Sequence, residues 1–225
     1  MYKIVKRLID IAVSLIGLLL LSPLFVVIAI IITADSPSGV FFRGPRVGLY
    51  GKTFKIYKFR SMRPDCEGKG KWNVGDKDDR ITRIGHILRK TKLDELPQLI
   101  NVMKGDMSLV GPRPELRYYV DMYTEREKPI LDNKPGITDW ASITNFEQFK
   151  GFTTALDPDE YYLKVVRPLK LELQLYYRHH AGFKDDFRCV LWTLYKVLTH
   201  SKRLPPEIQA IVDKHSMKAG NANEK

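Results

Sequence analysis

The feature that most limits how this chain can fold is an uncharged, apolar stretch at residues 11–34, IAVSLIGLLLLSPLFVVIAIIITA. At about 1.5 Å per residue, a helix of this length can cross a hydrocarbon core of ~30 Å. The stretch is too long for the apolar region of an ordinary secretory signal, and no clear small-x-small cleavage site follows it. We therefore expect it to stay on the protein as a membrane anchor.

Ser22 and Pro23 stand near the middle of this stretch. Pro23 cannot donate to the carbonyl of Leu19 and its ring crowds that turn, whereas the Ser22 hydroxyl can bond to freed backbone groups. Two arrangements follow. One is a kinked helix that spans the bilayer, which length alone favours. The other is a helix-break-helix that enters one leaflet and returns.

The charges on both sides of the stretch favour the second arrangement. Lys3, Lys6 and Arg7 precede it, and residues 36–64 carry seven basic residues and no acid. Under the positive-inside rule both flanks belong in the cytoplasm, which a single span cannot satisfy. We predict a re-entrant, monotopic anchor that breaks at Ser22 and Pro23 and occupies one leaflet.

Composition limits the partners. The chain has 225 residues and a formal charge of +11, so it suits one domain with an appendage and an anionic partner: nucleic acid, an anionic membrane surface or a phosphorylated substrate. Its two cysteines, Cys66 and Cys189, are far apart and indicate no disulfide framework and no zinc site. We divide the chain into an anchor (1–36), a cytosolic, membrane-associated catalytic domain (37–204) and a C-terminal tail (205–225).

The remaining pattern predicts an α+β fold that is mainly helical. Alternation across residues 40–62 predicts a β-hairpin, and its basic residues either meet lipid phosphates or a soluble diphosphate, or form an ordinary solvated face. Residues 80–92, with Ile81, Ile84, Ile87 and Leu88 on one face, predict a basic amphipathic helix that lies at the membrane interface or packs on the core. Further helices are expected at 115–134, 157–180 and 185–199, with a loop at 64–79.

The chemistry is expected in residues 91–115, TKLDELPQLINVMKGDMSLVGPRPE. Because Pro97 is tolerated only in the first helical turn, a helix is expected to begin near Asp94, which places the Asp94-Glu95 pair at its N-terminus. Paired carboxylates there can hold a divalent cation, divide the roles of nucleophile and base, or simply cap the helix. Arg113, held between two prolines, suits bidentate phosphate contact.

The order of these motifs resembles the bacterial sugar transferase family, the small monotopic phosphoglycosyl transferases typified by the initiating enzyme of bacterial N-glycosylation. After the basic N-terminus and the apolar segment broken at Ser22-Pro23, the collinear motifs are FKIYKFRSM (54–62), LDELPQ (93–98), KGDMSLVGPRP (104–114) and KPGIT (134–138). The resemblance covers roughly residues 1–200.

The resemblance implies a transferase on the cytosolic face of the bacterial cytoplasmic membrane. It would move a sugar-1-phosphate from a UDP-sugar to undecaprenyl phosphate, release UMP and start the assembly of a glycoconjugate. It implies that Asp94 is the nucleophile of a covalent phosphosugar intermediate and, with Mg²⁺, a metal ligand. Glu95 is implied as its partner for metal or proton handling, Arg113 and Lys58 as phosphate-binding residues, and Asp186 as a candidate further acid.

Residues 139–142, Asp-Trp-Ala-Ser, depart from the Gly-Trp-Ala-Gln that often stands there in the family, and residues 143–156 match poorly, which leaves the identity of the sugar open. Trp140 either belongs to the core or stacks on a ring of the substrate. The alternative function is a membrane-anchored basic scaffold for anionic lipid or nucleic acid. No nucleic-acid-binding motif supports that alternative, so we expect no nucleic acid among the partners.

Overall fold

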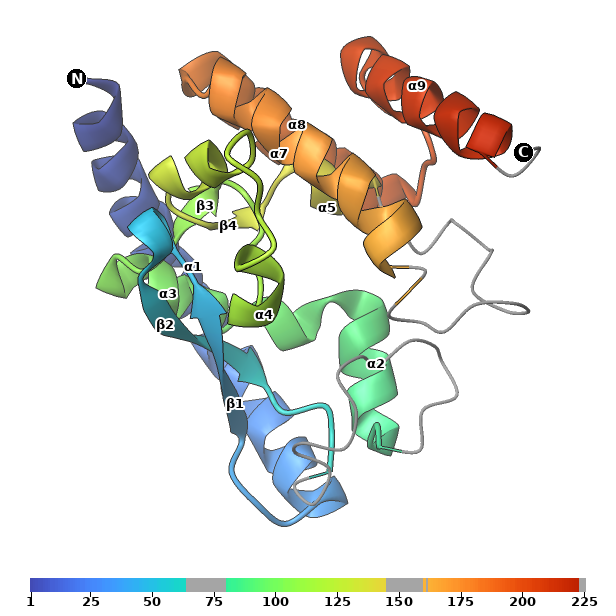
Figure 1. Cartoon of the computed structure of the whole chain (residues 1–225). Coiled ribbons are helices and arrows are strands. Elements are labelled where there is room, and N and C mark those ends of the chain that lie inside the picture. Colours follow the sequence, from blue (N-terminus) through green and yellow to red (C-terminus); the bar gives the residue numbers. More distant parts are fainter. Residues whose placement is uncertain (64–79, 145–159, 161, 223–225) are drawn as a thin grey trace.

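The computed structural model describes residues 1–63, 80–144, 160 and 162–222, with the backbone alone for residues 216–222. The predicted loop at 64–79 and the first residues of the helix predicted at 157–180 lie outside this part of the chain. The fold is predominantly helical with a small β component (Figure 1), as predicted. The helices are α1 (Tyr2–Asp35), α2 (Arg83–Thr91), α3 (Gln98–Lys104), α4 (Arg117–Val120), α5 (Trp140–Thr144), α7 (Arg167–His180), α8 (Phe183–Thr199) and α9 (Pro206–Ala222). The strands are β1 (Phe41–Val47), β2 (Thr53–Phe59), β3 (Ser108–Val110) and β4 (Gly136–Thr138).

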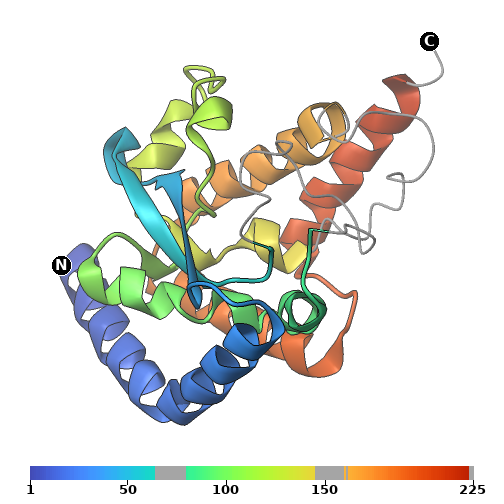
Figure 2. The same cartoon turned by 90° about the horizontal axis from the view of Figure 1, so that it is seen from below.

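The apolar stretch forms part of α1, a helix of 34 residues with Pro23 inside it. Among the described residues it is the one helix long and apolar enough to cross a membrane. The Ser22 hydroxyl donates to the Leu19 carbonyl at 2.8 Å, which satisfies the acceptor that Pro23 leaves near the break. Figure 2 shows α1 bent near its middle, so that its two limbs form a V and both ends reach the rest of the molecule.

Polar contacts hold the first limb of α1. The Arg7 guanidinium donates to the carbonyl of Met103 at 2.9 Å and also to that of Val102 at the C-terminal end of α3, where basic groups are favourable. The buried Asp10 accepts a bond of 3.1 Å from the backbone N–H of Leu109 in β3. These bonds give the first limb one defined position against α3 and β3.

Apolar packing holds the second limb. Ile28 and Ile32 are buried in a cluster with Phe59 of β2 and Leu88 of α2, and the ring of Phe25 meets Phe59 edge-on with centroids 5.0 Å apart. Leu93, the residue before Asp94, packs against the same cluster.

The predicted hairpin is confirmed. Strands β1 and β2 pair antiparallel with Phe41 opposite Phe59 and Val47 opposite Thr53. The connecting turn at Leu49–Gly51 needs left-handed backbone at Tyr50 (φ 54°) and at Gly51 (φ 75°), where glycine carries no steric cost.

A second, parallel pair joins β3 to β4. The two chains run very close just beyond it, since a Cβ on Gly136 would lie 2.1 Å from the backbone nitrogen of Gly111. Only glycine fits at this crossing. The crossing sets the direction in which the chain continues from Gly111 into Pro112 and Arg113.

Helix α2 confirms the helix predicted at 80–92, with Thr82 as its N-cap accepting from the Gly85 N–H at 3.0 Å. Leu88 is 2 % exposed against the anchor, while Ile87 is 57 % exposed. The two residues lie about 100° apart around the helix, so the predicted apolar face is buried at Leu88 and exposed at Ile87. One side of α2 packs on the protein and Ile87 points outward.

Two other expectations need correction. Residues 115–134 form only the single turn of α4 and a 3₁₀ segment at Lys128–Asp132, because Pro129 interrupts the run and Tyr119, Tyr123 and Ile130 are all buried. Residues 205–225, expected as a tail, include α9, whose Ile208 is fully buried in the main core beside Leu173 and Trp140. Helix α8 confirms the helix predicted at 185–199, and α7 the later part of the one at 157–180.

Candidate active site

The acid pair lies in a 3₁₀ turn, Leu93–Glu95, rather than in the first turn of a helix. The chain enters this turn through Lys92 in left-handed conformation (φ 59°), and α3 begins only at Gln98, with Pro97 at its N-cap. The predicted helix start at Asp94 is therefore wrong. Pro97 is compatible with either start, because it precedes α3 and removes no hydrogen bond from it.

Glu95 is the centre of a charge cluster built from three separate parts of the chain. Its Oε1 lies 2.6 Å from the Lys58 Nζ of β2. The Arg113 guanidinium donates to both oxygens, with Nη1 to Oε2 at 3.0 Å. The structure thus brings Lys58, Glu95 and Arg113 together.

The ionisation of this cluster follows from these contacts. Burial raises the pKa of Glu95, but the charges of Arg113 and Lys58 outweigh it and hold the pKa well below its usual 4.5. The Glu95 carboxylate raises the pKa of Arg113, whereas burial lowers the pKa of Lys58 despite the same neighbour. Glu95 and Arg113 therefore both stay charged at neutral pH.

Asp94, directly before Glu95 in the chain, has a pKa shifted in the opposite direction. Its side chain is buried, at 7 % exposed, and Oδ1 has no hydrogen-bond partner among the described residues. Burial raises its pKa above 3.8, with Lys58 acting against the rise. A desolvated carboxylate oxygen without a partner, beside fixed cations, is suited to attack phosphorus or to ligate a cation.

The described residues offer few ligands for the Mg²⁺ that the family resemblance implies. No group of three or more His, Cys, Asp or Glu in the described part of the chain is gathered closely enough to hold a metal ion. Both Glu95 oxygens are engaged by cations, which leaves Asp94 with the free ligand atom. Mg²⁺ is commonly held by one or two carboxylates together with substrate phosphates, and Asp94 fits that mode.

Asp186 takes part in a different set of contacts. It accepts from Tyr2 at 2.6 Å, from Lys6 at 2.7 Å and from Tyr177 at 2.7 Å. These bonds join the start of α1 to α7 and α8. None of these bonds connects Asp186 to the Glu95 cluster. Asp186 therefore links the N-terminal end of α1 to the rest of the protein.

Trp140 belongs to the core, which resolves the alternative of stacking on a substrate ring. It is 1 % exposed, and its indole Nε1 donates to Asp185 Oδ2 at 2.9 Å.

Sequence reasoning missed several residues around Arg113. Arg46 in β1 lies near enough to Arg113 that burial and then this neighbouring charge lower its pKa. Gln174 of α7 donates to the Arg113 carbonyl at 3.1 Å, and Asp139 accepts from the Arg113 N–H at 3.0 Å. Arg46 was noted only as one of many basic residues, and Gln174 carries no local signal because it is 61 residues from Arg113.

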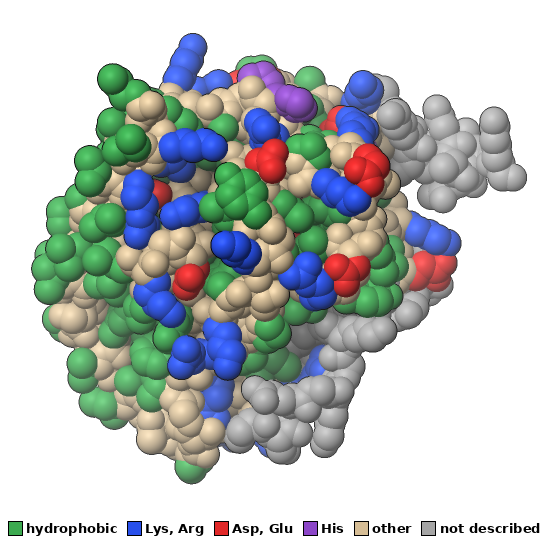
Figure 3. Space-filling view, turned by 60° about the vertical axis from the view of Figure 1, so that its left-hand side comes forward, with side chains coloured by type: hydrophobic (Ala, Val, Ile, Leu, Met, Phe, Trp, Pro, Cys, Tyr) green, Lys and Arg blue, Asp and Glu red, His purple; other side chains and the backbone are tan. Residues whose placement is uncertain are grey.

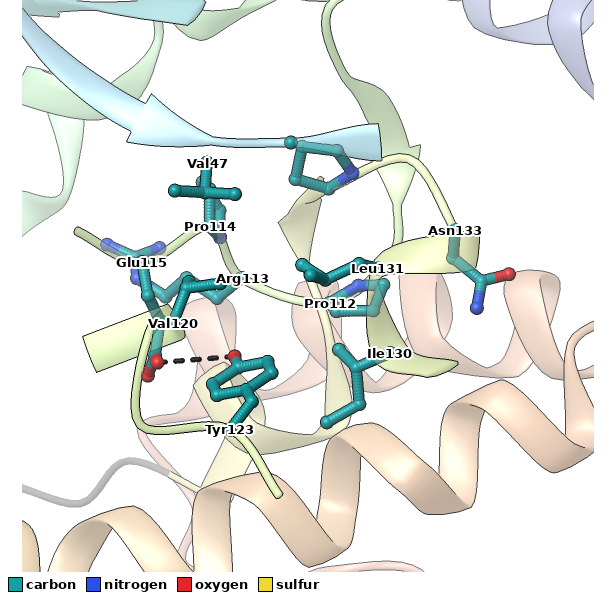
Figure 4. A pocket seen from close by; sticks show the side chains of 12 residues that line it. Val47, Pro112, Arg113, Pro114, Glu115, Val120, Tyr123, Ile130, Leu131 and Asn133 are labelled. Atoms are coloured by element: carbon teal, nitrogen blue, oxygen red, sulfur yellow. Dashed lines mark hydrogen bonds between the residues drawn. The ribbon is translucent and has the colours of Figure 1, made fainter. Parts of the chain in front are cut away.

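Behind the Arg113 loop lies a small cavity of about 20 Å³, lined by residues that include Val47, Pro112, Tyr123 and Ile130 (Figure 4). Such a volume holds about one water molecule. The cavity is therefore too small for a ligand larger than water, and Lys58 and Glu95 are not among the residues that line it.

Known proteins resemble this chain over the same span. Residues 1–200 match the profile described as bacterial sugar transferase. Over 202 residues the chain is 39 % identical to a UDP-N-acetylgalactosamine-undecaprenyl-phosphate N-acetylgalactosaminephosphotransferase of Aeromonas hydrophila, covering 88 % of this chain and 44 % of that protein. It is 37 % identical to an uncharacterized sugar transferase, EpsL, of Bacillus subtilis, covering 87 % of this chain and 88 % of the relative.

A third relative is a UDP-glucose:undecaprenyl-phosphate glucose-1-phosphate transferase of Escherichia coli, 37 % identical over 201 residues, covering 86 % of this chain and 40 % of that protein. The chain thus spans less than half the length of the Aeromonas and Escherichia relatives and most of the length of the Bacillus one. The profile match and these identities lead to one conclusion: the chain belongs to the bacterial sugar transferase family.

Proposed function

We propose that this protein is a monotopic phosphoglycosyl transferase that moves a sugar-1-phosphate from a UDP-sugar to undecaprenyl phosphate. The observation that carries the proposal is the pair of adjacent carboxylates in unlike surroundings. Asp94 has a buried oxygen free to react, and Glu95 holds two cations beside it. The names of the Aeromonas and Escherichia relatives state this class of reaction for those proteins.

The reaction runs in two steps. The Asp94 carboxylate attacks the β-phosphorus of the donor, the bond to the oxygen bridging the two phosphorus atoms breaks, and UMP leaves with that oxygen. An oxygen of undecaprenyl phosphate then attacks the same phosphorus and displaces the Asp94 carboxylate. A covalent step of this kind lets a soluble donor and a lipid acceptor use one site in turn.

Lys58 and Arg113 supply the positive charge that phosphoryl transfer needs. Arg113 has five N–H donors and Lys58 three, of which Glu95 takes only part, so both can also bind a diphosphate. We assign Glu95 to holding these two cations in place, since neither of its oxygens is free. When bound by Asp94 and the donor's phosphates, Mg²⁺ would further neutralise the charge that develops on the diphosphate.

The bent α1 supports a re-entrant anchor on one leaflet. Both limbs contact the same domain, through Arg7 and Asp10 on the first and through Ile28 and Ile32 on the second, and both carry exposed apolar side chains. Helix α8 adds exposed apolar residues one helical turn apart: Phe187, Leu191, Leu194 and Leu198. Figure 3 shows a face with Lys and Arg side chains among fewer acids, next to a margin of hydrophobic side chains. This distribution suits an anionic membrane surface and supports the proposal that Asp94 works beside that surface, on the cytosolic side.

The catalytic proposal is tested by UMP release in nanodiscs with magnesium, undecaprenyl phosphate and a panel of UDP-sugars that includes UDP-glucose and UDP-N-acetylgalactosamine. We expect one donor to support release, and Asp94→Asn to reduce the rate by roughly 10⁴-fold or more, as for other removed nucleophiles. The matched control is Asp121→Asn, an exposed acid paired with Arg117, which should keep full activity. Undiminished release by Asp94→Asn, or a phosphosugar trapped on another residue, refutes the assignment of the nucleophile. Release from no donor favours the scaffold alternative.

The topology is tested separately with reporters fused to the two ends of the chain. We expect both reporters in the cytosol. Reporters on opposite sides of the membrane contradict the re-entrant anchor, whatever the outcome of the activity assay.

A further inference from the structure

We propose that one face of α7 is a positioning surface for Arg113, with Gln174 and the buried Asp139 as the residues that set the orientation of its guanidinium toward the donor's diphosphate. The proposal rests on the proposed function, because it concerns how the same site binds its donor. It adds residues that lie outside the motifs carrying the chemistry.

The face of α7 is defined by Lys170, Gln174 and Tyr177, which fall at helical spacing on one side of the helix. Each lies against a different point along the segment from β3 to Glu115. Gln174 Nε2 donates to the Arg113 carbonyl at 3.1 Å, and Lys170 Nζ donates to Glu115 Oε1 at 2.5 Å. The Tyr177 hydroxyl, which donates its proton to Asp186, lies 3.2 Å from the Val110 carbonyl. A single rigid helix therefore supports the segment before, at and after Arg113.

Asp139 binds the other backbone polar group of Arg113, its N–H. Its Oδ2 accepts from the backbone N–H of Arg113 at 3.0 Å and lies 3.4 Å from Gln174 Nε2, while its Oδ1 accepts from the Ser142 N–H at the start of α5. Both backbone polar groups of Arg113 are thus bound by side chains that are each 1 % exposed. Buried polar groups of this kind cannot shift without leaving a partner unsatisfied.

The position of Arg113 matters because its guanidinium has to serve two partners. It binds Glu95 through two nitrogens and must present its remaining donors to the diphosphate. Reacting groups displaced by about 1 Å can lose 10²-fold in rate. Prolines on both sides limit the backbone of the loop, and Gln174 and Asp139 select one position for it.

The experiment is a double-mutant cycle on the full chain in nanodiscs. Gln174→Met removes the N–H that donates to the Arg113 carbonyl at nearly constant side-chain volume. Arg113→Lys keeps the positive charge but loses the planar guanidinium with its paired N–H groups. The donor is whichever UDP-sugar supports UMP release by the wild type. We expect Gln174→Met to lower kcat/KM by about tenfold, well within the cost of a small misplacement. In the Arg113→Lys background the same change should have less than about a twofold effect.

Three further arms separate positioning from general damage. Glu172→Gln, on another face of α7 and bonded to Arg126, should leave kcat/KM unchanged. Asp139→Ala should behave as Gln174→Met does and replaces it in the cycle if that variant does not fold. Asp139→Asn retains an acceptor for the Arg113 N–H and should keep most of the activity.

The outcomes are distinct. A Gln174 effect of equal size in both backgrounds, or no effect in an active wild type, overturns the positioning role and leaves the proposed function intact. A wild type that releases UMP from no UDP-sugar overturns the proposed function, and the positioning role with it. Weaker binding of UDP by Gln174→Met than by Glu172→Gln, measured by calorimetry, supports the role without turnover.

Discussion

Two glutamate-centred clusters meet at the Arg113-Pro114-Glu115 segment, and they differ in how completely they are enclosed. In the first, Glu95 pairs with Lys58 at 2.6 Å, and the two side chains are 15 % and 20 % exposed. In the second, Glu115 pairs with Lys170 at 2.5 Å, and the side chains are 2 % and 10 % exposed. The pairing distances are nearly the same, so distance alone does not separate them.

The difference lies in spare hydrogen-bonding capacity. Glu115 also accepts from Tyr162 at 2.8 Å and from Tyr123 at 3.2 Å, the bond drawn in Figure 4, so its two oxygens are enclosed by protein donors. Around Glu95 the cations keep unused donors, and Asp94 next to it keeps an unused acceptor. A closed cluster of this kind stabilises the fold, whereas an open one is ready for a ligand. The following changes test that contrast.

The largest effect should come from opening the closed cluster with Lys170→Met. This change leaves the Glu115 charge buried without its cation, which typically costs about 3–5 kcal/mol. For a chain of this size we expect the apparent Tm to fall by about 10 °C. Lys164→Met, which breaks the exposed pair with Glu160, is the control and should shift Tm by a few degrees at most. Similar shifts in both variants would show that the enclosure of the Glu115 cluster has no energetic role.

Neutralising the centre of the open cluster should affect activity more than stability. Glu95→Gln keeps the shape of the side chain but releases Lys58 and Arg113 from their charged partner. We expect kcat/KM for the UDP-sugar to fall about 10²-fold through misplacement of the two cations. Tm should change by less than it does in Lys170→Met. A large loss of Tm with little loss of activity would reverse the assignment of the two clusters.

Acid should weaken the closed cluster by neutralising Glu115. Burial raises the pKa of Glu115, but Lys170 and the hydrogen bonds outweigh it, so its folded pKa lies below its usual 4.5. A depressed folded pKa gives stability above the unfolded pKa that disappears as the pH falls through the folded value, about 1.4 kcal/mol for each unit of depression.

The Tm advantage of the wild type over Glu115→Gln should therefore be full near neutral pH and shrink as the pH drops below about 4.5, the usual value for glutamate. Thermal unfolding of both proteins across this range measures it. A gap that is constant with pH would mean that the Glu115 charge does not contribute.

The smallest effect is expected at the exposed ion pair between Glu172 of α7 and Arg126. Arg126→Gln removes the partner of Glu172, whose side chain is 35 % exposed, while Arg126 is 71 % exposed. Such pairs contribute about 0–1 kcal/mol, so Tm and UMP release should both stay near the wild-type values. A loss comparable to that of Lys170→Met would show that the loop depends on more of α7 than its Lys170, Gln174 and Tyr177 face.

Local patterns were predictable from the sequence, and long-range contacts were not. The alternation in Thr53–Phe59 identified the hairpin, and the motifs around Lys58, Asp94, Glu95 and Arg113 identified residues that the fold gathers or places side by side. The support from Gln174 and Lys170 joins residues 61 and 55 positions apart. The periodicity of α7 shows that it has a buried face, but not which loop that face meets.

The errors have similar causes. Pro97 is compatible with a helix that starts at either Asp94 or Gln98, and only the observed 3₁₀ turn distinguishes the two. Residues 115–134 contain enough helix-favouring side chains to predict one continuous helix. In the structure they form separate short turns, and Tyr119, Tyr123 and Ile130 are buried from different ones of these turns. The tail reads as weakly patterned because its helix α9 buries few side chains, with Ile208 the deepest of those described.

The tie between the start of α1 and Asp186 has a consequence for biosynthesis. Tyr2 and Asp186 are 184 residues apart, so their bond can form only after α8 has been synthesised. Chains grow at roughly 5–20 residues per second, so about ten seconds or more separate the appearance of the two partners. The partners of Arg7 and Asp10 lie between Val102 and Leu109 and are made well before Asp186. The Asp186 contact is therefore among the last long-range contacts of α1 that can form.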